Sequence, residues 1–108
     1  MANTFKLKTK ANVGVTTSNV YTVPSATTTV VIGVTLANTT GSSINEGVGV
    51  TRASTDDVKL MKNVPIPQGS SFEFMAGNKV VLETTDTLTA ASDVNNSLDV
   101  ALTIMEIT

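Results

Sequence analysis

The sequence predicts an all-β protein, an antiparallel β-sandwich of about eight or nine short strands with jelly-roll or immunoglobulin-like strand order. Three observations support this fold class. Apolar and polar residues alternate along most of the chain, as in strands with one buried face. Gly, Pro, Asn, Asp and Ser interrupt the alternation at short, regular intervals. No segment has the periodicity of an amphipathic helix.

Residues 1–108 are expected to form a single β-sandwich domain, because a chain of this length supports one modest core. Hydrophobic residues make up 41% of the chain but aromatic residues only 4%, so the core must consist mainly of Val, Ile, Leu and Ala. Charged residues are 15%, below the share of about 25% in typical globular domains. A sparsely charged surface rich in Thr indicates contact with other protein.

The N-terminal part contains three expected strands. The first covers 4–11 and alternates apolar residues with lysines. The second covers 19–23 and stops at Pro24, whose ring fixes φ and which has no N–H to donate. The third covers 28–38 and has the strongest pattern. One of its faces is expected to carry Val30, Ile32, Val34 and Leu36.

The rest of the chain continues in the same way. Turn-forming residues at 39–43 and 92–96 separate strands, and the proline segment at 65–69 is expected to fix a crossing between the two sheets. In the last strand Leu98, Val100, Leu102 and Ile104 share one face, joined by the side of Glu106. The remaining expected strands cover 44–53, 58–64, 71–75, 79–83, 87–91 and 97–108.

The chain lacks the two residue types most often used in catalysis and metal binding. The chain contains no His and no Cys, so it lacks the commonest general base, thiolate and metal ligand. Acidic pairs such as Asp56 and Asp57 lie in turns, where Asp commonly caps backbone groups. We therefore expect no enzymatic activity, and we assign no catalytic, cofactor-binding or metal-binding residue.

The charge balance bears on the class of partner. The formal net charge is −2 and the sequence pI is about 4.8, which does not favour nucleic acid or anionic membranes as partners. No segment approaches the roughly 18 apolar residues of a membrane span, and the N-terminus has no apolar signal core. We expect a protein that is not carried across a membrane by the usual signal.

Five residues are candidates for an interface: Phe5, Lys6, Lys8, Lys10 and Arg52. The three lysines share one face of the first expected strand and form either a basic stripe that docks on an acidic partner or a solvated face that discourages edge pairing. Arg52 is the single arginine, and it either anchors an interface or pairs with a nearby Asp.

Several segments together resemble a known group of proteins. They are 20–24, 31–41 and 65–71, with 79–83 and 106–108 in support. The chain resembles small virion structural proteins of tailed phages, especially phages of marine bacteria and cyanobacteria. The similarity spans most of the chain and rests on strand and turn patterns.

The resemblance implies a β-sandwich protein that is carried in the virion after assembly in the host cytoplasm. The first expectation is a capsid decoration or cement protein that forms a homo-oligomer, binds the major capsid protein and stabilises the shell. Its shell contact is expected at the N-terminal strand, with 39–43 and 92–96 at outward or inter-subunit ends. The alternative is a tail or baseplate adaptor or fibre-attachment protein. A receptor- or carbohydrate-binding module is less favoured, because the chain has no Trp and one Tyr.

Overall fold

The computed structural model describes residues 2–52, 56–74 and 79–108, and at 72 and 74 it describes the backbone alone. This part of the chain contains nine strands and no helix. The strands are β1 (Asn3–Val13), β2 (Ser18–Thr22), β3 (Thr28–Asn38), β4 (Ile44–Thr51), β5 (Asp57–Ile66), β6 (Ser71–Phe74), β7 (Val80–Leu82), β8 (Thr87–Ser92) and β9 (Leu98–Ile107).

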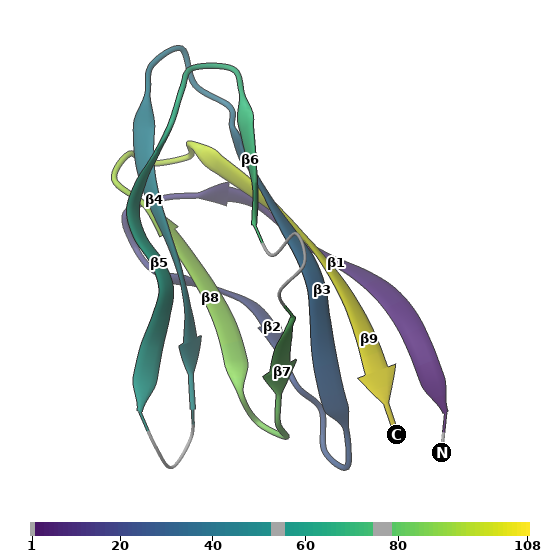
Figure 1. Ribbon diagram of the computed structural model, residues 1–108. Coiled ribbons are helices and arrows are strands. Elements are labelled where there is room, and N and C mark those ends of the chain that lie inside the picture. The colour runs from purple at the N-terminus through teal and green to yellow at the C-terminus, as the bar shows by residue number, and fades with distance from the viewer. Residues whose placement is uncertain (1, 53–55, 75–78) are drawn as a thin grey trace.

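The strands form two stacked antiparallel sheets (Figure 1). One sheet has the order β1-β9-β3-β6, and β7 also pairs with β3; the other has the order β2-β8-β4-β5. Because β6 and β7 pair with different parts of β3, together they fill one strand position. The resulting order is that of a jelly roll. The predicted antiparallel β-sandwich is therefore confirmed, and strand order separates the jelly roll from the immunoglobulin-like alternative.

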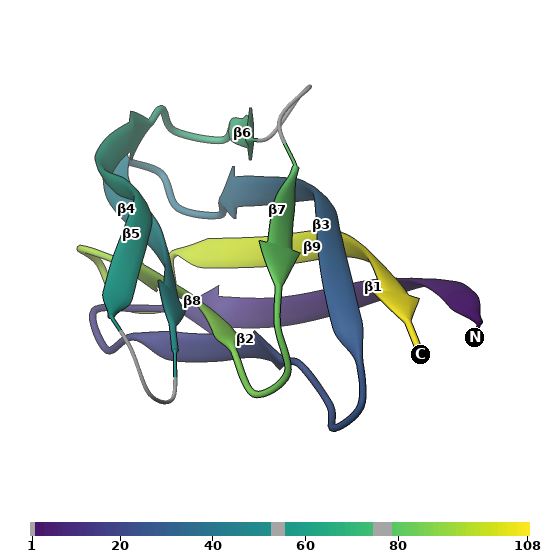
Figure 2. The same ribbon diagram turned by 60° about the horizontal axis from the view of Figure 1, so that its bottom comes forward.

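The two chain ends lie side by side at one corner of the sandwich (Figure 2). There Ala2 and Thr108 exchange backbone hydrogen bonds of 3.0 and 2.9 Å. The strand bounds follow the prediction closely, and those of β3 match it fully. The strand ends expected at 53 and 75 lie outside the described residues.

A bulge in β3 changes which side chains face the core. The register between β3 and β9 shifts between Val31 and Gly33, so the alternation of faces reverses there. Val31 is buried together with Val34, whereas Val30 and Ile32 remain partly exposed. The apolar face predicted for this strand is therefore wrong in its first half, because periodicity alone does not reveal an extra residue in a strand.

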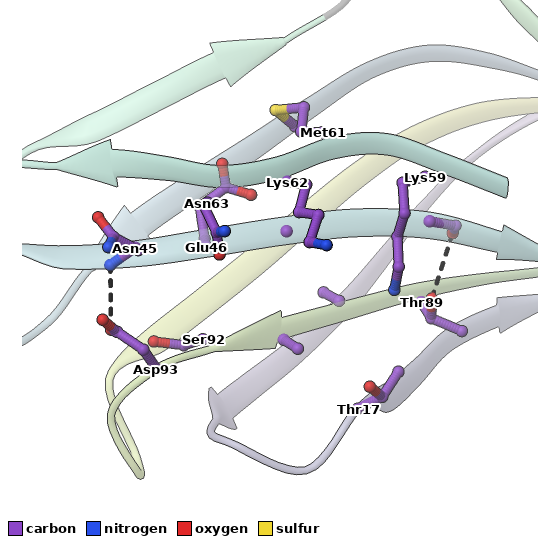
Figure 3. Close-up of a pocket in the computed structure, with 14 residues that line it drawn as sticks. Thr17, Asn45, Glu46, Lys59, Met61, Lys62, Asn63, Thr89, Ser92 and Asp93 are labelled. Atoms are coloured by element: carbon purple, nitrogen blue, oxygen red, sulfur yellow. Dashed lines mark hydrogen bonds between the residues drawn. The ribbon is translucent and has the colours of Figure 1, made fainter.

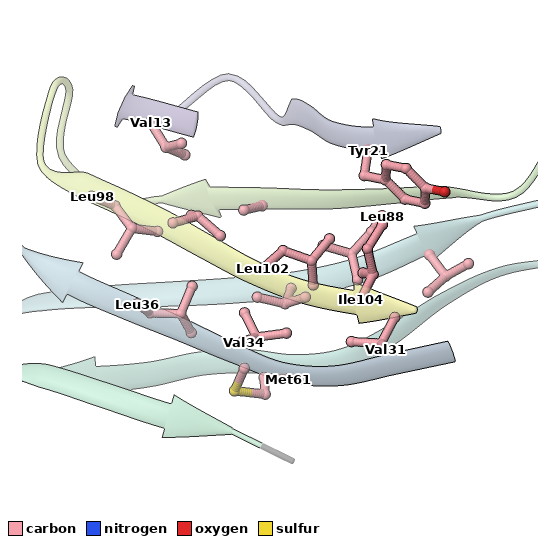
Figure 4. Packing of buried hydrophobic residues seen from close by; sticks show 14 of the residues in the cluster. Val13, Tyr21, Val31, Val34, Leu36, Met61, Leu88, Leu98, Leu102 and Ile104 are labelled. Atoms are coloured by element: carbon pink, nitrogen blue, oxygen red, sulfur yellow. The ribbon is translucent and has the colours of Figure 1, made fainter. Parts of the chain in front are cut away.

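Strand β9 lies at the centre of the core, between β1 and β3. Its alternate side chains are almost completely buried, as the sequence predicted. They form one cluster with apolar residues of the facing sheet, such as Leu88 (Figure 4). Tyr21 is the one aromatic side chain of this cluster among the described residues. The buried members from β9 are Leu98, Val100, Leu102 and Ile104.

One amide side chain connects the two sheets at the end of the sandwich remote from the termini. Asn38, the last residue of β3, donates from Nδ2 to the carbonyl oxygens of Ser42, Ile66 and Pro67 at 2.7, 3.0 and 3.2 Å. Its Oδ1 accepts the N–H of Thr40 at 2.9 Å. The same residue therefore organises the expected turn at 39–43 and anchors the chain where it leaves β5 for the other sheet.

Two leucines test the assignment of inner and outer faces. Leu102 is fully buried and Leu7 is 64% exposed, although both lie in the same sheet. We expect Leu102→Ala to lower the free energy of unfolding by about 2–5 kcal/mol, because it leaves a cavity in the core. Leu7→Ala is the matched control and should change it by less than about 0.5 kcal/mol. Urea unfolding at low protein concentration measures both; equal losses would contradict the assignment.

Candidate assembly surface

Strand β1 is an edge strand whose apolar side faces outward. Its register places Phe5 opposite Met105 and Lys6 opposite Ile104. Side chains directly opposite each other in antiparallel strands share a face, so Lys6 lies on the core side with the buried Ile104. Phe5 and Leu7 point away from the core and are 70% and 64% exposed. An exposed apolar face on a strand is a feature that the core does not explain.

A row of four apolar side chains crosses the outer face of the five-stranded sheet. The strand register pairs β1 with β9, β9 with β3 and β3 with β7 at matching positions, so the four residues are successive neighbours. The two ends of the row are the most exposed, at 70% and 58%. We call this set the outer row. Its members are Phe5, Met105, Val30 and Val81.

The other end of the same face carries small side chains. Thr9 lies opposite Ala101, and Ala101 lies opposite Thr35. These residues line a shallow groove of about 240 Å³ together with Ala11 and Ala37. We call it the small-residue groove. One sheet face thus has large side chains at one end and a depression at the other.

The outer face carries few charges. Two carboxylates, those of Asp99 and Glu73, lie at or beyond the small-residue groove. Asp99 Oδ1 accepts the backbone N–H of Asn12 at 3.0 Å. The positions between the groove and the outer row are uncharged: Leu7, Thr103 and Gly33. Binding at this face must therefore depend on apolar area and shape more than on charge.

A buried polar cluster holds β1, β2, β3 and β9 together beneath this face. Glu106 Oε1 lies 2.8 Å from Lys6 Nζ, and Glu106 Oε2 accepts a 2.6 Å hydrogen bond from the Tyr21 hydroxyl. The Tyr21 oxygen also lies 2.8 Å from Thr29 Oγ1. The bonds from Lys6 and Tyr21 lower the pKa of Glu106. Burial, together with the hydrogen bond to Glu106, raises the pKa of Tyr21 to about 12.

The three lysines predicted as a stripe share one face of β1, opposite Ile104, Leu102 and Val100, but their contacts differ. Lys6 is engaged by Glu106, whereas Lys8 Nζ lies 5.9 Å from the centre of the Tyr21 ring, within the range of a cation–π contact. Lys8 is partly exposed, and Lys10 is exposed beside the small-residue groove. Lys6 and Lys10 are thus the more exposed lysines of β1, but Lys6 is held in the ion pair with Glu106.

Arg52 follows β4 and lies among carboxylates of its own chain. Its Nε is 3.2 Å from Asp86 Oδ1, and its Nη2 pairs with Glu83. Asp86 in turn accepts the backbone N–H of Glu83 at 2.9 Å. This arrangement is the intramolecular pairing that the sequence left as one of two interpretations. The side chain is 38% exposed, so part of the guanidinium still reaches solvent.

Glu46 is a buried carboxyl group without a hydrogen-bond partner among the described residues. In the pairing of β4 with β8 it lies opposite Ser92 and two residues from the buried Val48, on the core side of the sheet. It borders a groove of about 190 Å³ across β4, β5 and β8, whose rim carries Lys59 and Lys62 (Figure 3). Burial raises the pKa of Glu46 from its ordinary 4.5 to about 7.

The sequence predicted strand β1 but not the outer row of apolar side chains. The alternation in β1 was visible, yet the outer row needs partners from β9, β3 and β7, which the sequence does not align. The position of Glu106 on the core face was predicted from its alternation with the buried residues of β9. The same signal was present for Glu46, an acidic residue in the alternation from Ile44 to Val50.

The described residues also limit the kinds of site. Within 2–52, 56–74 and 79–108, no group of three or more His, Cys, Asp or Glu side chains could hold a metal ion. In that part of the chain no helix is long and apolar enough to cross a membrane.

The pH dependence of stability should reveal Glu46. Its raised pKa means that the folded state binds more protons than the unfolded state between pH 4.5 and about 7. The free energy of unfolding should therefore fall by about 3 kcal/mol as pH rises through this window, and this contribution is lost above it. Glu106, whose pKa is lowered, stays ionised throughout the window. Urea unfolding at about pH 5 and about pH 8 measures the change.

Glu46→Gln should remove this dependence and make the protein more stable than the wild type at the higher pH. Glu73→Gln is the control, because Glu73 is exposed, and it should keep the wild-type profile. A wild-type free energy of unfolding that does not depend on pH, or the same loss of pH dependence in both variants, would contradict the raised pKa of Glu46.

Tyr21→Phe should weaken the cluster that joins the two sheets. Losing the hydroxyl leaves Glu106 with one partner fewer and should cost about 1–3 kcal/mol of stability at neutral pH. Glu106 stabilises the fold above its ordinary pKa, and this contribution is lost as pH falls through its lowered folded pKa. As pH is lowered, the variant should therefore begin to lose stability at a higher pH than the wild type does. Thr22→Val, which removes an exposed hydroxyl contact, is the control and should change neither quantity appreciably.

Comparison with known proteins shows similarity of fold. No protein-family model matches the chain, and no curated protein matches it. A solved structure of Bacillus endospore appendages, described as a novel family of disulfide-linked pili, is similar, with a TM-score of 0.59 and 12% sequence identity. The match covers 99% of this chain and 87% of that chain. This chain therefore shares its small all-β fold with a structural protein that forms pili.

Proposed function

We propose that this chain is a virion structural protein, a capsid decoration protein that is bound in many copies to the major capsid protein and stabilises the shell. The observation that carries the proposal is the outer row, four apolar side chains that lie on an outer sheet face which no described segment covers. A contiguous exposed apolar face of this kind commonly marks a protein–protein interaction site.

The outer face has the properties of a protein-binding surface. Its apolar side chains are contiguous and its charges are few, as in the centre of protein interfaces. It is also built on strands of eleven and ten residues, β1 and β9, which pair along most of their length. A rigid backbone loses little conformational entropy on binding, so a modest area can still give useful affinity.

The free edge of β1 supports a separate contact with the shell. Strand β1 pairs with β9 on one side, and its other edge has no strand neighbour among the described residues. The strand contains three lysines and no acidic residue, although the chain as a whole has a net charge of −2. Lys8 and Lys10 at this edge suit an acidic surface of the major capsid protein.

A second candidate is a subunit of a homopolymeric fibre. The specific observation in its favour is the similarity in fold to the pilus structure, which covers nearly all of this chain. The 108 residues contain no cysteine, so copies of this chain would have to be held by non-covalent contacts. Spontaneous growth of filaments by the purified protein would favour this candidate over decoration.

Charge reversal tests the shell contact. We expect the double variant Lys8→Glu/Lys10→Glu to bind undecorated capsids of the source particle at least about tenfold more weakly, because two attractive charges become repulsive. The matched control is Lys59→Glu/Lys62→Glu, which makes the same charge change on β5 of the other sheet. The control should stay within about twofold of the wild type, as measured by co-sedimentation at moderate ionic strength.

Two results would count against the proposed function. One is a wild-type protein that does not bind capsids, and the other is an equal loss of binding in both double variants. Copy number in the intact particle supplies a second measurement. On the order of hundreds of copies supports decoration, whereas about six or twelve copies would point to the tail or baseplate.

A further inference from the structure

We propose that the outer face of the five-stranded sheet binds the same face of a second copy of this chain, about a two-fold axis that runs across the strands above Leu7. The inference rests on the proposed function, because it names the occupant of the apolar face on which that function depends. It adds a defined partner, a symmetry and a set of contacting residues.

The spacing of the two ends of the face fits such an axis. The outer row and the small-residue groove are four residues apart along β1, from Phe5 to Thr9, or about 13 Å at the usual rise of a strand. Leu7 lies midway, in line with Thr103 and Gly33. A two-fold axis over this middle line places the outer row of each copy on the groove of the other.

The residues brought together are complementary in size. Phe5 of one copy meets Thr9 of the other, and Met105 meets Ala101. On the next strand Val30 meets Thr35, a side chain of similar size, and at the fourth strand position Val81 meets the exposed Glu73. The groove of about 240 Å³ has room for such side chains. This is the self-complementary pattern of an isologous interface, in which one patch carries both halves of the contact.

The middle line allows the two faces to approach closely. A Cβ added at Gly33 would meet nothing within 4 Å, so the face is low and open at this position. Leu7 of each copy meets Leu7 of the other at the axis, which adds an apolar contact between exposed side chains. Packed sheets lie about 10 Å apart, a spacing that side chains of these sizes can fill.

The contact area fits a dimer of moderate affinity, although each Glu73 carboxylate lies against the apolar Val81 of the other copy. Four strand positions and the stretch from Asn3 to Ala11 span about 19 by 27 Å, or on the order of 1,000 Å² for two copies. This area is near the lower limit for a specific interface and predicts a dimer of moderate affinity. Asp99 lies four residues from Thr103, so the two Asp99 carboxylates are about 27 Å apart and do not repel each other strongly.

Single-cysteine crosslinking tests the axis, because the chain has no native cysteine. Thr103→Cys puts one thiol beside the axis, and Thr22→Cys puts one at an exposed strand position of the other sheet. With a short bis-maleimide at micromolar protein concentration, Thr103→Cys should give crosslinked dimer as its main product. Thr22→Cys should give only background.

Two substitutions test the two halves of the contact in solution. Phe5→Ser removes a large side chain, and Ala101→Glu fills the groove with a charge. Each should raise the dimer dissociation constant at least about tenfold in sedimentation experiments. Val15→Ser, at a position 57% exposed outside the face, is the control and should leave the constant within about twofold. Unchanged urea midpoints for the monomers show that the variants are folded.

The outcomes separate this inference from the proposed function. A wild-type protein that stays monomeric, or equal crosslinking at both cysteine positions, overturns the second copy as occupant even if capsid binding persists. Loss of capsid binding in Phe5→Ser without any wild-type dimer overturns it as well, because the shell would then occupy the face. Dimers that crosslink through Thr103→Cys but do not bind capsids support the inference and count against decoration.

Discussion

The packing of β9 between β1 and β3 is the interaction on which the rest of the structure depends. Every second side chain of β9 enters the core, and the residues between them reach the outer face. The strand therefore fixes the register of both neighbours, and through them it fixes which side chains of β1 face outward. Both the buried cluster and the outer row follow from this one alignment.

Two acidic residues on the core faces have opposite environments. Glu106 lies where Lys6 and Tyr21 can reach it, so burial is offset by an ion pair and a hydrogen bond. Glu46 lies on β4 with no such partner among the described residues, and it is favoured in its protonated form. The sandwich thus contains one charge that joins its sheets and one carboxyl group that opposes its stability when ionised.

Much of the fold could be predicted from the sequence, because strand alternation is a local property. The buried face of β9 and the strand bounds of β3 were predicted directly. The bulge between Val31 and Gly33 was not, because an inserted residue leaves the pattern unchanged on either side of it. The outer row was also missed. Phe5 and Val81 come from strands far apart in sequence, and only the pairing through β9 and β3 aligns them.

The sequence identified the lysines of β1 but not their separate environments. Their spacing is the same from Lys6 to Lys10, yet the ion pair of Glu106 is made with Lys6. That difference comes from a residue at the opposite end of the chain, which alternation within β1 cannot supply.

The low charge density of the outer face has a consequence for the media in which the protein can work. At physiological ionic strength, dissolved salt largely screens attraction between exposed charges more than about 8–10 Å apart, and it does not weaken apolar contact. At high salt concentration, a capsid contact made by the lysines at the edge of β1 would weaken. The apolar contact between the outer faces of two copies would persist or become stronger. A particle built with both would keep its paired subunits at high salinity and gain shell adhesion on dilution.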